Sequence, residues 1–150
     1  IIPPVISGIL KLIESTGENF KGKKVVLLVN SELFATPLRY LLEQKETKVK
    51  MFLKPMLQAS GSMLHEFDII VIALGRPNFL KADMIKDGAV IIDVGTTKVD
   101  GKLCGDADFE SFKKRDVFIT PVPGGVGPMT VAMLLQNVYI LAKNSQKDGF

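Results

Sequence analysis

The sequence predicts an α/β protein of the Rossmann-like, doubly wound type, with a mostly parallel sheet and helices on both faces. Continuous apolar runs flanked by polar residues occur several times, as expected of strands buried on both sides. These runs alternate with segments whose apolar residues recur at helical spacing, which is the pattern of a parallel sheet. At 150 residues and 47% hydrophobic content, the chain is long enough to bury the core of one domain.

Five segments are predicted to form the strands of this sheet. In chain order they are Val25–Val29, Lys48–Leu53, Asp68–Leu74, Ala89–Val94 and Val117–Ile119. The first, third and fourth consist largely of Val, Ile and Leu, which suits the centre of a parallel sheet. A polar turn or hairpin over 96–102 follows the fourth strand.

The segments around these strands carry helix signals. Helices are predicted, in order, at 5–13 (ending near Gly17), 36–45, 79–86 and 128–144, with an irregular helix around Gly61 and a short one capped by Asp106 or Asp108. Pro37 and Pro128 suit a first helical turn, because proline lacks an N–H that would have no partner there. We therefore expect a loop over 31–35, before Thr36 and Pro37 start the second helix.

Glycines follow three of the predicted strands: Gly75, Gly95, and the pair Gly124 and Gly125. Ligands of open parallel sheets bind outside the carboxyl ends of the strands. The last pair belongs to a loop, 121–130, whose prolines restrict it and whose glycines expose N–H groups at a helix start. A tight turn without a ligand would use the same residues, but the three positions together predict a nucleotide-type site.

The turn after the first strand departs from a dinucleotide-binding pattern. Such domains place glycines there, so that the pyrophosphate can approach the backbone. Residues 29–37 contain none, and Glu32 would repel a phosphate.

Composition argues against several other classes of function. A net charge of +3 with scattered lysines does not predict a nucleic-acid surface, and no apolar run approaches the ~20 residues of a membrane span. A single cysteine, Cys104, cannot form an internal disulfide and suits the cytoplasm. The lone His65 cannot make a metal site, so we expect no metal.

Four segments closely resemble the bifunctional methylenetetrahydrofolate dehydrogenase/methenyltetrahydrofolate cyclohydrolase (FolD-type) family. They are 83–89, 90–95, 101–106 and the highly specific Pro-Gly-Gly-Val-Gly-Pro-Met-Thr run at 123–130. Nearly the whole chain resembles the family's C-terminal NAD(P)-binding domain. The resemblance implies a cytoplasmic, homodimeric enzyme of one-carbon metabolism and purine biosynthesis. Such an enzyme passes a hydride from methylenetetrahydrofolate to NADP or NAD, and water then opens the methenyl product.

The resemblance also implies which residues bind the cofactor. The family's Gly-Arg-Ser phosphate loop falls on Val29, Asn30 and Ser31, and a later glycine of that loop falls on Ala35. The implied cofactor-binding residues are Asn30, Ser31, Lys54, Gly75, Gly95, Thr96 and Thr97. The implied substrate-side loop contributes Pro123, Gly124, Gly125 and Thr130.

The family's catalytic tyrosine and lysine lie in the preceding, folate-binding domain, so no catalytic residue is expected in this chain. The family arranges them as Tyr-x-x-x-Lys. Tyr139 and Lys143 have this spacing too, but they lie on the last predicted helix, so chance explains the match better than function. The chain starts with Ile rather than Met, and we expect the folate-binding half to be absent. An alternative is a diverged, non-catalytic relative with impaired nucleotide binding that serves as a scaffold or dimerisation module. A third is another nucleotide-dependent oxidoreductase of the same architecture.

Overall fold

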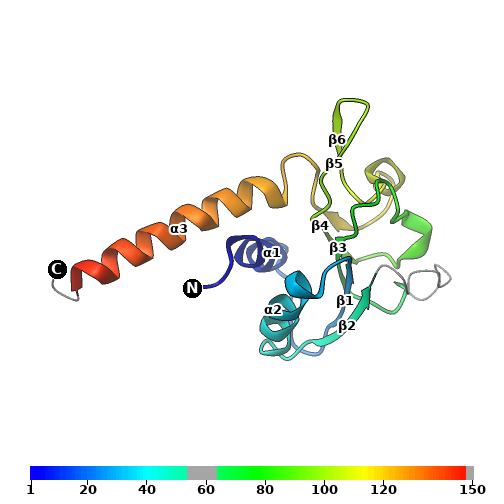
Figure 1. The fold of residues 1–150 in the computed structure, drawn as a ribbon. Coiled ribbons are helices and arrows are strands. Elements are labelled where there is room, and N and C mark those ends of the chain that lie inside the picture. Colours follow the sequence, from blue (N-terminus) through cyan, green and yellow to red (C-terminus); the bar gives the residue numbers. More distant parts are fainter. Residues whose placement is uncertain (54–63, 148–150) are drawn as a thin grey trace.

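The computed structural model describes residues 1–53 and 64–147, and Figure 1 shows their arrangement. Five strands form one parallel sheet in the spatial order β2-β1-β3-β4-β7. Their bounds are β1 Lys24–Val29, β2 Lys48–Leu53, β3 Ile69–Ala73, β4 Val90–Asp93 and β7 Phe118–Ile119. All five predicted strands are therefore present, and the predicted parallel α/β class is confirmed.

One face of the sheet is covered by two α-helices, α1 (Pro4–Ser15) and α2 (Glu32–Glu43). Alternate strand residues such as Val25, Leu27 and Val29 point into this layer, as the two-residue period of a strand requires. On the other face, Val26 and Leu28 pack with apolar side chains from short 3-10 turns and loops. These include η3 (Ala82–Met84) and η4 (Phe109–Phe112).

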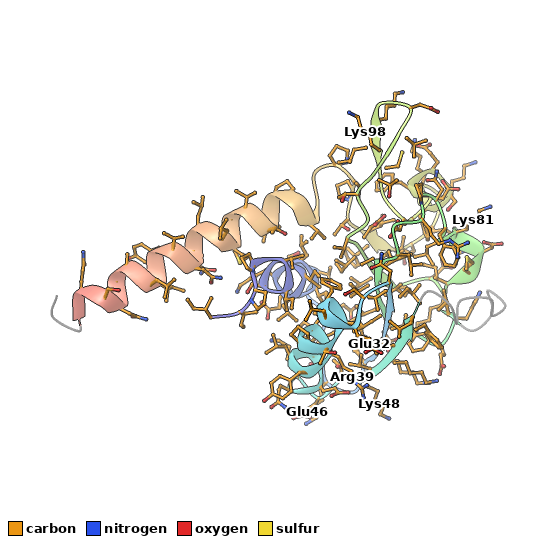
Figure 2. The ribbon with its side chains drawn as sticks, in the orientation of Figure 1. Glu32, Arg39, Glu46, Lys48, Lys81 and Lys98 are labelled. Carbon is orange, nitrogen blue, oxygen red and sulfur yellow. The ribbon has the colours of Figure 1, made fainter. Side chains whose placement is uncertain are left out.

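The last helix, α3 (Val126–Lys147), lies beside α1 and then extends away from the sheet (Figure 1). Gly8 allows the two helices to approach closely, because a Cβ there would lie 3.3 Å from the Met129 Cβ. Much of α3 is exposed, and Figure 2 shows its side chains projecting along its length. None of the helices in residues 1–53 and 64–147 is long and apolar enough to cross a membrane.

The second helix begins earlier than the sequence predicted. It starts at Glu32, so the expected loop over 31–35 is helical and Pro37 lies inside the helix. Ala35 and Leu38 are fully buried against the sheet. The burial of this face offsets the hydrogen bond that Pro37 cannot make.

The predicted helix over 79–86 is wrong except for one 3-10 turn, η3. The main chain of Leu80 is instead extended and pairs with a distant segment. Its N–H donates to the Asp106 carbonyl at 3.0 Å, and its carbonyl accepts from the Asp108 N–H at 2.8 Å. A residue that forms these two bonds cannot also form a helical ladder.

The remaining elements follow the prediction with small changes of boundary. The polar turn is a hairpin of β5 (Thr97–Val99) and β6 (Lys102–Cys104), which projects from the body of the molecule in Figure 1. Asp108 is the N-cap residue of η4, although its side chain makes no capping hydrogen bond. Gly61, where an irregular helix was predicted, lies outside the described residues.

Candidate functional site

The carboxyl ends of β1, β3, β4 and β7 lie at the same edge of the sheet, because the strands are parallel and in register. We call this edge the strand-tip rim, and define it by residues 30–32, 74–76, 93–96 and 120–126. Its parts are joined by side-chain hydrogen bonds. The Asn30 Nδ2 donates to the Leu74 carbonyl at 3.2 Å, which connects the ends of β1 and β3.

The turn that follows β3 is held by one buried carboxylate. Asp106 is fully buried, and its Oδ2 accepts hydrogen bonds from the N–H groups of Leu74 (2.6 Å) and Gly75 (3.0 Å). Its Oδ1 accepts a third from the Arg76 N–H at 2.7 Å. All three amides of the turn are therefore directed inward, toward Asp106.

A second buried carboxylate, Asp93, holds the segment that carries the first. Asp93 Oδ1 accepts from the N–H groups of Gly95 (2.8 Å) and Asp106 (3.0 Å), and Oδ2 accepts from Ala107 (2.8 Å). The N–H of Asp93 donates in turn to the Thr120 Oγ1 at 2.8 Å, at the end of β7. The chain of contacts thus runs from Asn30 through Asp106 and Asp93 to Thr120, across four strand ends.

These carboxylates lie close together in a poorly solvated place. Burial raises the pKa of the Asp93 carboxyl, and the Asp106 carboxylate adds to the rise, although three N–H donors act in the opposite direction. The arrangement therefore costs free energy at neutral pH, and the backbone hydrogen bonds only partly compensate.

Two glycines of this region are explained by lack of space. A Cβ at Gly95 would collide with the Asp106 side chain, and one at Gly105 would collide with the Asp93 carboxylate. Gly75 differs, because a Cβ there would meet only the Asn30 Nδ2 at 3.7 Å, and its φ of +66° is what favours glycine.

Next to this network is a cleft of about 470 Å³ between the ends of β4 and β7 and the first turn of α3. Thr96 and the predicted substrate-side residues Pro123, Gly124, Gly125 and Thr130 all line it. Asp93, Val94, Leu103 and Val5 complete much of its wall. The lining is mostly apolar with a few polar groups, as in small-molecule sites.

The amino end of α2 forms the other part of the rim. Ser31 is the N-cap residue in an extended conformation, and its hydroxyl makes no capping bond. A helix start favours anions, but Glu32 in the first turn opposes them. Ala35 is fully buried and faces the core instead of the rim.

The structure thus brings most of the predicted residues to one edge. Asn30 and Gly75 are in direct proximity, and Gly95 is linked to the Gly75 turn through Asp106. Thr96 and the loop over 123–130 share the cleft, whereas Thr97 starts the projecting hairpin. Lys54 lies outside the described residues.

Sequence reasoning missed Asp93, Asp106 as a turn-holding residue, and Thr120. One signal was available for Asp93, since it ends an otherwise apolar strand, and a carboxylate there must find donors. Asp106 was expected only as a possible helix cap. Its partners lie about thirty residues earlier in the chain, and no local pattern points to them.

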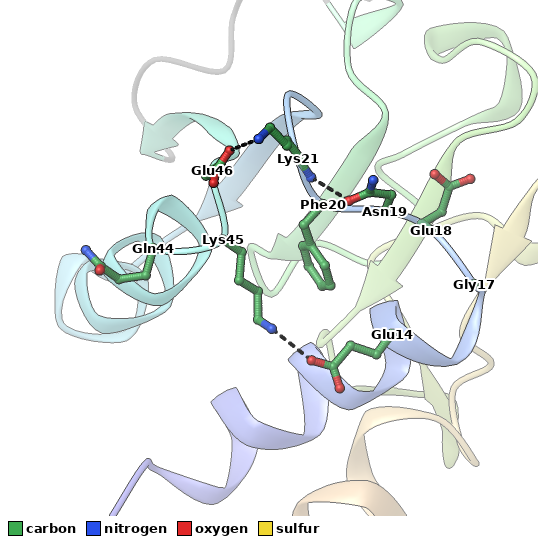
Figure 3. A pocket seen from close by; sticks show the side chains of 9 residues that line it. All are labelled: Glu14, Gly17, Glu18, Asn19, Phe20, Lys21, Gln44, Lys45 and Glu46. Atoms are coloured by element: carbon green, nitrogen blue, oxygen red, sulfur yellow. Dashed lines mark hydrogen bonds and ion pairs between the residues drawn. The ribbon is translucent and has the colours of Figure 1, made fainter.

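A second hollow, of about 370 Å³, lies at the opposite edge of the sheet (Figure 3). It is lined by charged residues that pair with each other. Lys45 contacts Glu14 at 2.9 Å and covers the Phe20 ring, while Lys21 pairs with Glu46 at 3.0 Å. With its charges satisfied internally, this hollow is a weaker candidate than the rim.

Other candidate groups do not form a site in residues 1–53 and 64–147. No cluster of three His, Cys, Asp or Glu residues suited to a metal occurs among them. The Lys143 Nζ lies 6.0 Å from the Tyr139 ring centre, on the projecting part of α3.

Comparisons with known proteins agree with this geometry. Residues 3–146 match the family model described as "Tetrahydrofolate dehydrogenase/cyclohydrolase, NAD(P)-binding domain". The chain is 44% identical over 145 residues to "Bifunctional protein FolD" of Bacillus pumilus, covering 96% of this chain and 51% of that protein. A protein of the same name from Campylobacter hominis is also 44% identical, over 147 residues, with 97% and 51% coverage.

Solved structures give the same result. The bifunctional FolD dehydrogenase/cyclohydrolase of Campylobacter jejuni superposes with a TM-score of 0.88 at 36% identity, covering 97% of this chain and 51% of that one. The Trypanosoma brucei methylenetetrahydrofolate dehydrogenase-cyclohydrolase, solved with NADP cofactor and an inhibitor, has a TM-score of 0.88 at 37% identity, with 97% and 52% coverage. The chain therefore spans about half the length of these relatives.

Proposed function

Because the chain belongs to the tetrahydrofolate dehydrogenase/cyclohydrolase family as its NAD(P)-binding domain, we propose that it binds NADP or NAD along the strand-tip rim. In the parent protein the bound nucleotide would accept a hydride from methylenetetrahydrofolate, and a cyclohydrolase step would then open the methenyl product. The observation that carries this proposal is the convergence of four strand ends and two helix starts on one edge of the sheet.

The rim has two chemically different parts, which suit the two ends of a dinucleotide. At the amino end of α2, Asn30 and the free Ser31 hydroxyl can donate hydrogen bonds to phosphate or ribose oxygens. The family resemblance also implies that Lys54, which lies outside the described residues, pairs with a cofactor phosphate. In the cleft, the mostly apolar wall and Thr96 suit a flat, uncharged ring such as nicotinamide. Thr97 would lie at the margin of this part.

Compared with the Gly-Arg-Ser loop that the family resemblance implies, the residues at the amino end of α2 are expected to bind a phosphate more weakly. Asn30 carries no charge, and its amide already donates to the Leu74 carbonyl. Glu32 lies in the first turn of α2, where a negative charge competes with a phosphate for the positive end of the helix. We therefore propose that the chain binds the nucleotide with modest affinity. Because residues 29–37 contain no arginine, we propose no strong preference for NADP over NAD.

We also propose that the part of the relatives that this chain does not match binds the tetrahydrofolate substrate and carries the catalytic residues. The outward face of α3 is its contact surface. Six apolar residues there are more than half exposed: Val131, Leu134, Leu135, Val138, Tyr139 and Leu141. No charged residue occurs between Val126 and Ala142. The Asn137 Nδ2 donates to the Ile2 carbonyl at 2.9 Å, so residues 1–2 lie beside this helix.

As the family resemblance implies, we propose that the parent protein is a cytoplasmic homodimer that serves purine biosynthesis. Analytical ultracentrifugation of the parent protein tests the oligomeric state, and a single monomeric species at micromolar concentration would contradict it.

Titration of the chain with NADPH and with NADH, followed by nucleotide fluorescence, tests the binding proposal. We expect saturable binding of at least one nucleotide, weakened by salt because phosphates contribute. Absence of any saturable signal into the millimolar range would overturn it. As a control for the contribution of charge far from the rim, Lys113→Met removes a cation at η4 and should leave nucleotide binding unchanged.

A further inference from the structure

The turn after β3 is the part of the strand-tip rim in which one side chain, that of Asp106, accepts three consecutive backbone N–H groups. Gly75 and Arg76 are exposed at the rim, but the amides of Leu74, Gly75 and Arg76 all donate to Asp106. With the Asn30 amide on the Leu74 carbonyl as well, the turn is fixed by four hydrogen bonds from outside its own segment.

Asp106 is fixed in turn by Asp93. The Asp106 N–H donates to Asp93, as does that of Ala107, so the segment cannot move along the sheet without breaking both bonds. The lack of a side chain at Gly95 and Gly105 leaves room for the two carboxylates. Five backbone N–H groups besides that of Asp106 itself are thereby ordered by two side chains from β4 and the segment after β6.

The arrangement has a chemical consequence for a ligand. An N–H that donates inward cannot also donate to a phosphate at the rim, and a carboxylate behind the turn repels an anion. Apart from the Arg76 guanidinium, which lies over the Phe79 ring at 4.6 Å from its centre, the turn can therefore offer a nucleotide only its carbonyl oxygens and the bare Cα of Gly75. These suit an uncharged part of the dinucleotide, such as a ribose hydroxyl or a ring edge.

We propose that Asp106 and Asp93 are positioning residues for the nucleotide: Asp106 fixes the Leu74–Arg76 turn against an uncharged part of the cofactor, and Asp93 fixes Asp106. This inference rests on the proposed binding of NADP or NAD to the rim. It adds a role for two buried residues that act through the backbone segments they hold.

The direction in which Asp106→Asn changes the affinity for NADPH distinguishes a positioning role of Asp106 from a purely electrostatic one. In Asp106→Asn, the amide oxygen can accept from Leu74 and Gly75, but the NH2 group then faces the Arg76 N–H, a donor against a donor. Removing a negative charge should by itself tighten binding of anionic NADPH. Loss of position should weaken it, and we expect about tenfold weaker binding, because the part-buried Arg76 N–H loses its partner.

Asp108→Asn is the matched control. It removes the same charge two residues away, on a side chain that makes no capping hydrogen bond. We expect binding unchanged or slightly tighter. Leu42→Ala, in the core beneath α2, controls for general loss of stability and should lower the thermal midpoint without a comparable loss of affinity.

Amide hydrogen exchange of the free chain gives a readout that does not depend on the nucleotide. In Asp106→Asn, the amide of Arg76 should exchange at least about tenfold faster, because its acceptor is lost, while that of Val71 in the centre of β3 stays protected. Asp93→Asn should weaken NADPH binding as well, and the double variant should lose less than the sum of the two losses.

The outcomes distinguish the two proposals. Wild-type chain that binds neither NADPH nor NADH overturns the proposed function, and the positioning role fails with it. Wild-type binding with unchanged or tighter binding by Asp106→Asn overturns the positioning role alone. Weaker binding with unchanged exchange at Arg76 also contradicts it, because the loss would not pass through the turn.

Discussion

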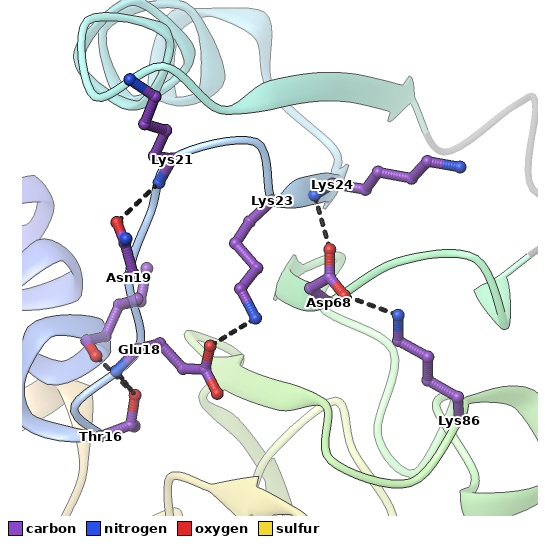
Figure 4. Close-up of polar contacts among 9 residues, drawn as sticks. Thr16, Glu18, Asn19, Lys21, Lys23, Lys24, Asp68 and Lys86 are labelled. Atoms are coloured by element: carbon purple, nitrogen blue, oxygen red, sulfur yellow. Dashed lines mark hydrogen bonds and ion pairs between the residues drawn. The ribbon is translucent and has the colours of Figure 1, made fainter.

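Asp68 provides a quantitative test of the electrostatics at the amino edge of the sheet (Figure 4). Its Oδ2 accepts from the Lys24 N–H at 2.8 Å, at the start of β1, and its Oδ1 contacts the Lys86 Nζ at 2.6 Å. Burial alone would raise the pKa of Asp68, but the Lys86 ammonium and the Lys24 N–H outweigh it, so the pKa is lowered. The ionised form is therefore preferred in the folded state.

The change to test is Asp68→Asn. The side chain of Asp68 is 26% exposed and that of Lys86 is 38% exposed, so solvent screens the pair in part. A charge-assisted hydrogen bond contributes about 1.5–3 kcal/mol. Solvent screening reduces this contribution, and the asparagine side chain keeps one acceptor for the Lys24 N–H. We therefore expect Asp68→Asn to lower the free energy of unfolding at pH 7 by about 1–2 kcal/mol.

The pH dependence follows from the direction of the shift. A lowered pKa in the folded state gives stability that is complete above the unfolded value of about 3.9 and is lost as the pH falls through the folded value. Urea unfolding at pH 7 and at about pH 2.5 should therefore show that the difference in the free energy of unfolding between wild type and Asp68→Asn becomes smaller on acidification. The asparagine side chain of the variant cannot titrate, and acid effects common to both proteins cancel in the comparison.

Two controls define what would refute this reasoning. Lys86→Met removes the ion pair but keeps the Lys24 bond, and should cost less than Asp68→Asn. Lys113→Met breaks a pair in which both side chains are mostly exposed, and should change stability by less than about 0.5 kcal/mol. If wild type and Asp68→Asn differ in the free energy of unfolding by the same amount at both pH values, the carboxylate charge of Asp68 contributes nothing to stability.

Four further changes test the rim and the core. Gly125→Ala would place a Cβ 2.6 Å from the Pro121 carbonyl oxygen and should cost about 1–3 kcal/mol in urea unfolding; Gly127→Ala, with nothing within 4 Å, should cost none. Thr120→Val removes the acceptor of the Asp93 N–H and should cost about 1–3 kcal/mol by the same measurement, and full stability would contradict the contact. Leu42→Ala empties a fully buried site against the sheet and should cost about 2–5 kcal/mol. Glu32→Gln should tighten NADPH binding about two- to fivefold at low salt and less at high salt, whereas equal affinity would place the phosphates away from α2.

Local patterns predicted the parts of the fold that depend on local chemistry. The run Val25–Val29 is buried at every position, which is why its apolar composition identified it as a central strand. Likewise Pro128 does lie in the first turn of α3, as its missing N–H suggested. The glycine positions after the strands correctly indicated one edge of the sheet.

The errors concern contacts between distant segments. The backbone of Leu80 pairs with residues 106 and 108, which prevented the helix that its neighbourhood suggested. Pro37 was given a first-turn position, whereas burial of Ala35 extends the helix by one turn before it. Gly95 stays a predicted cofactor-binding residue, and the contact that sequence could not show is the one behind it, where Asp106 fills the space a side chain would need.

The most direct test of nucleotide binding at the strand-tip rim is NMR mapping of backbone amides during titration of the isotope-labelled chain with NADPH. We expect saturable shifts at residues 30–33, at Gly75 and Arg76, and at Thr96 and 124–127, with none around Glu14 and Lys45. Shifts concentrated in the hollow of Figure 3, or no shifts into the millimolar range, would contradict it.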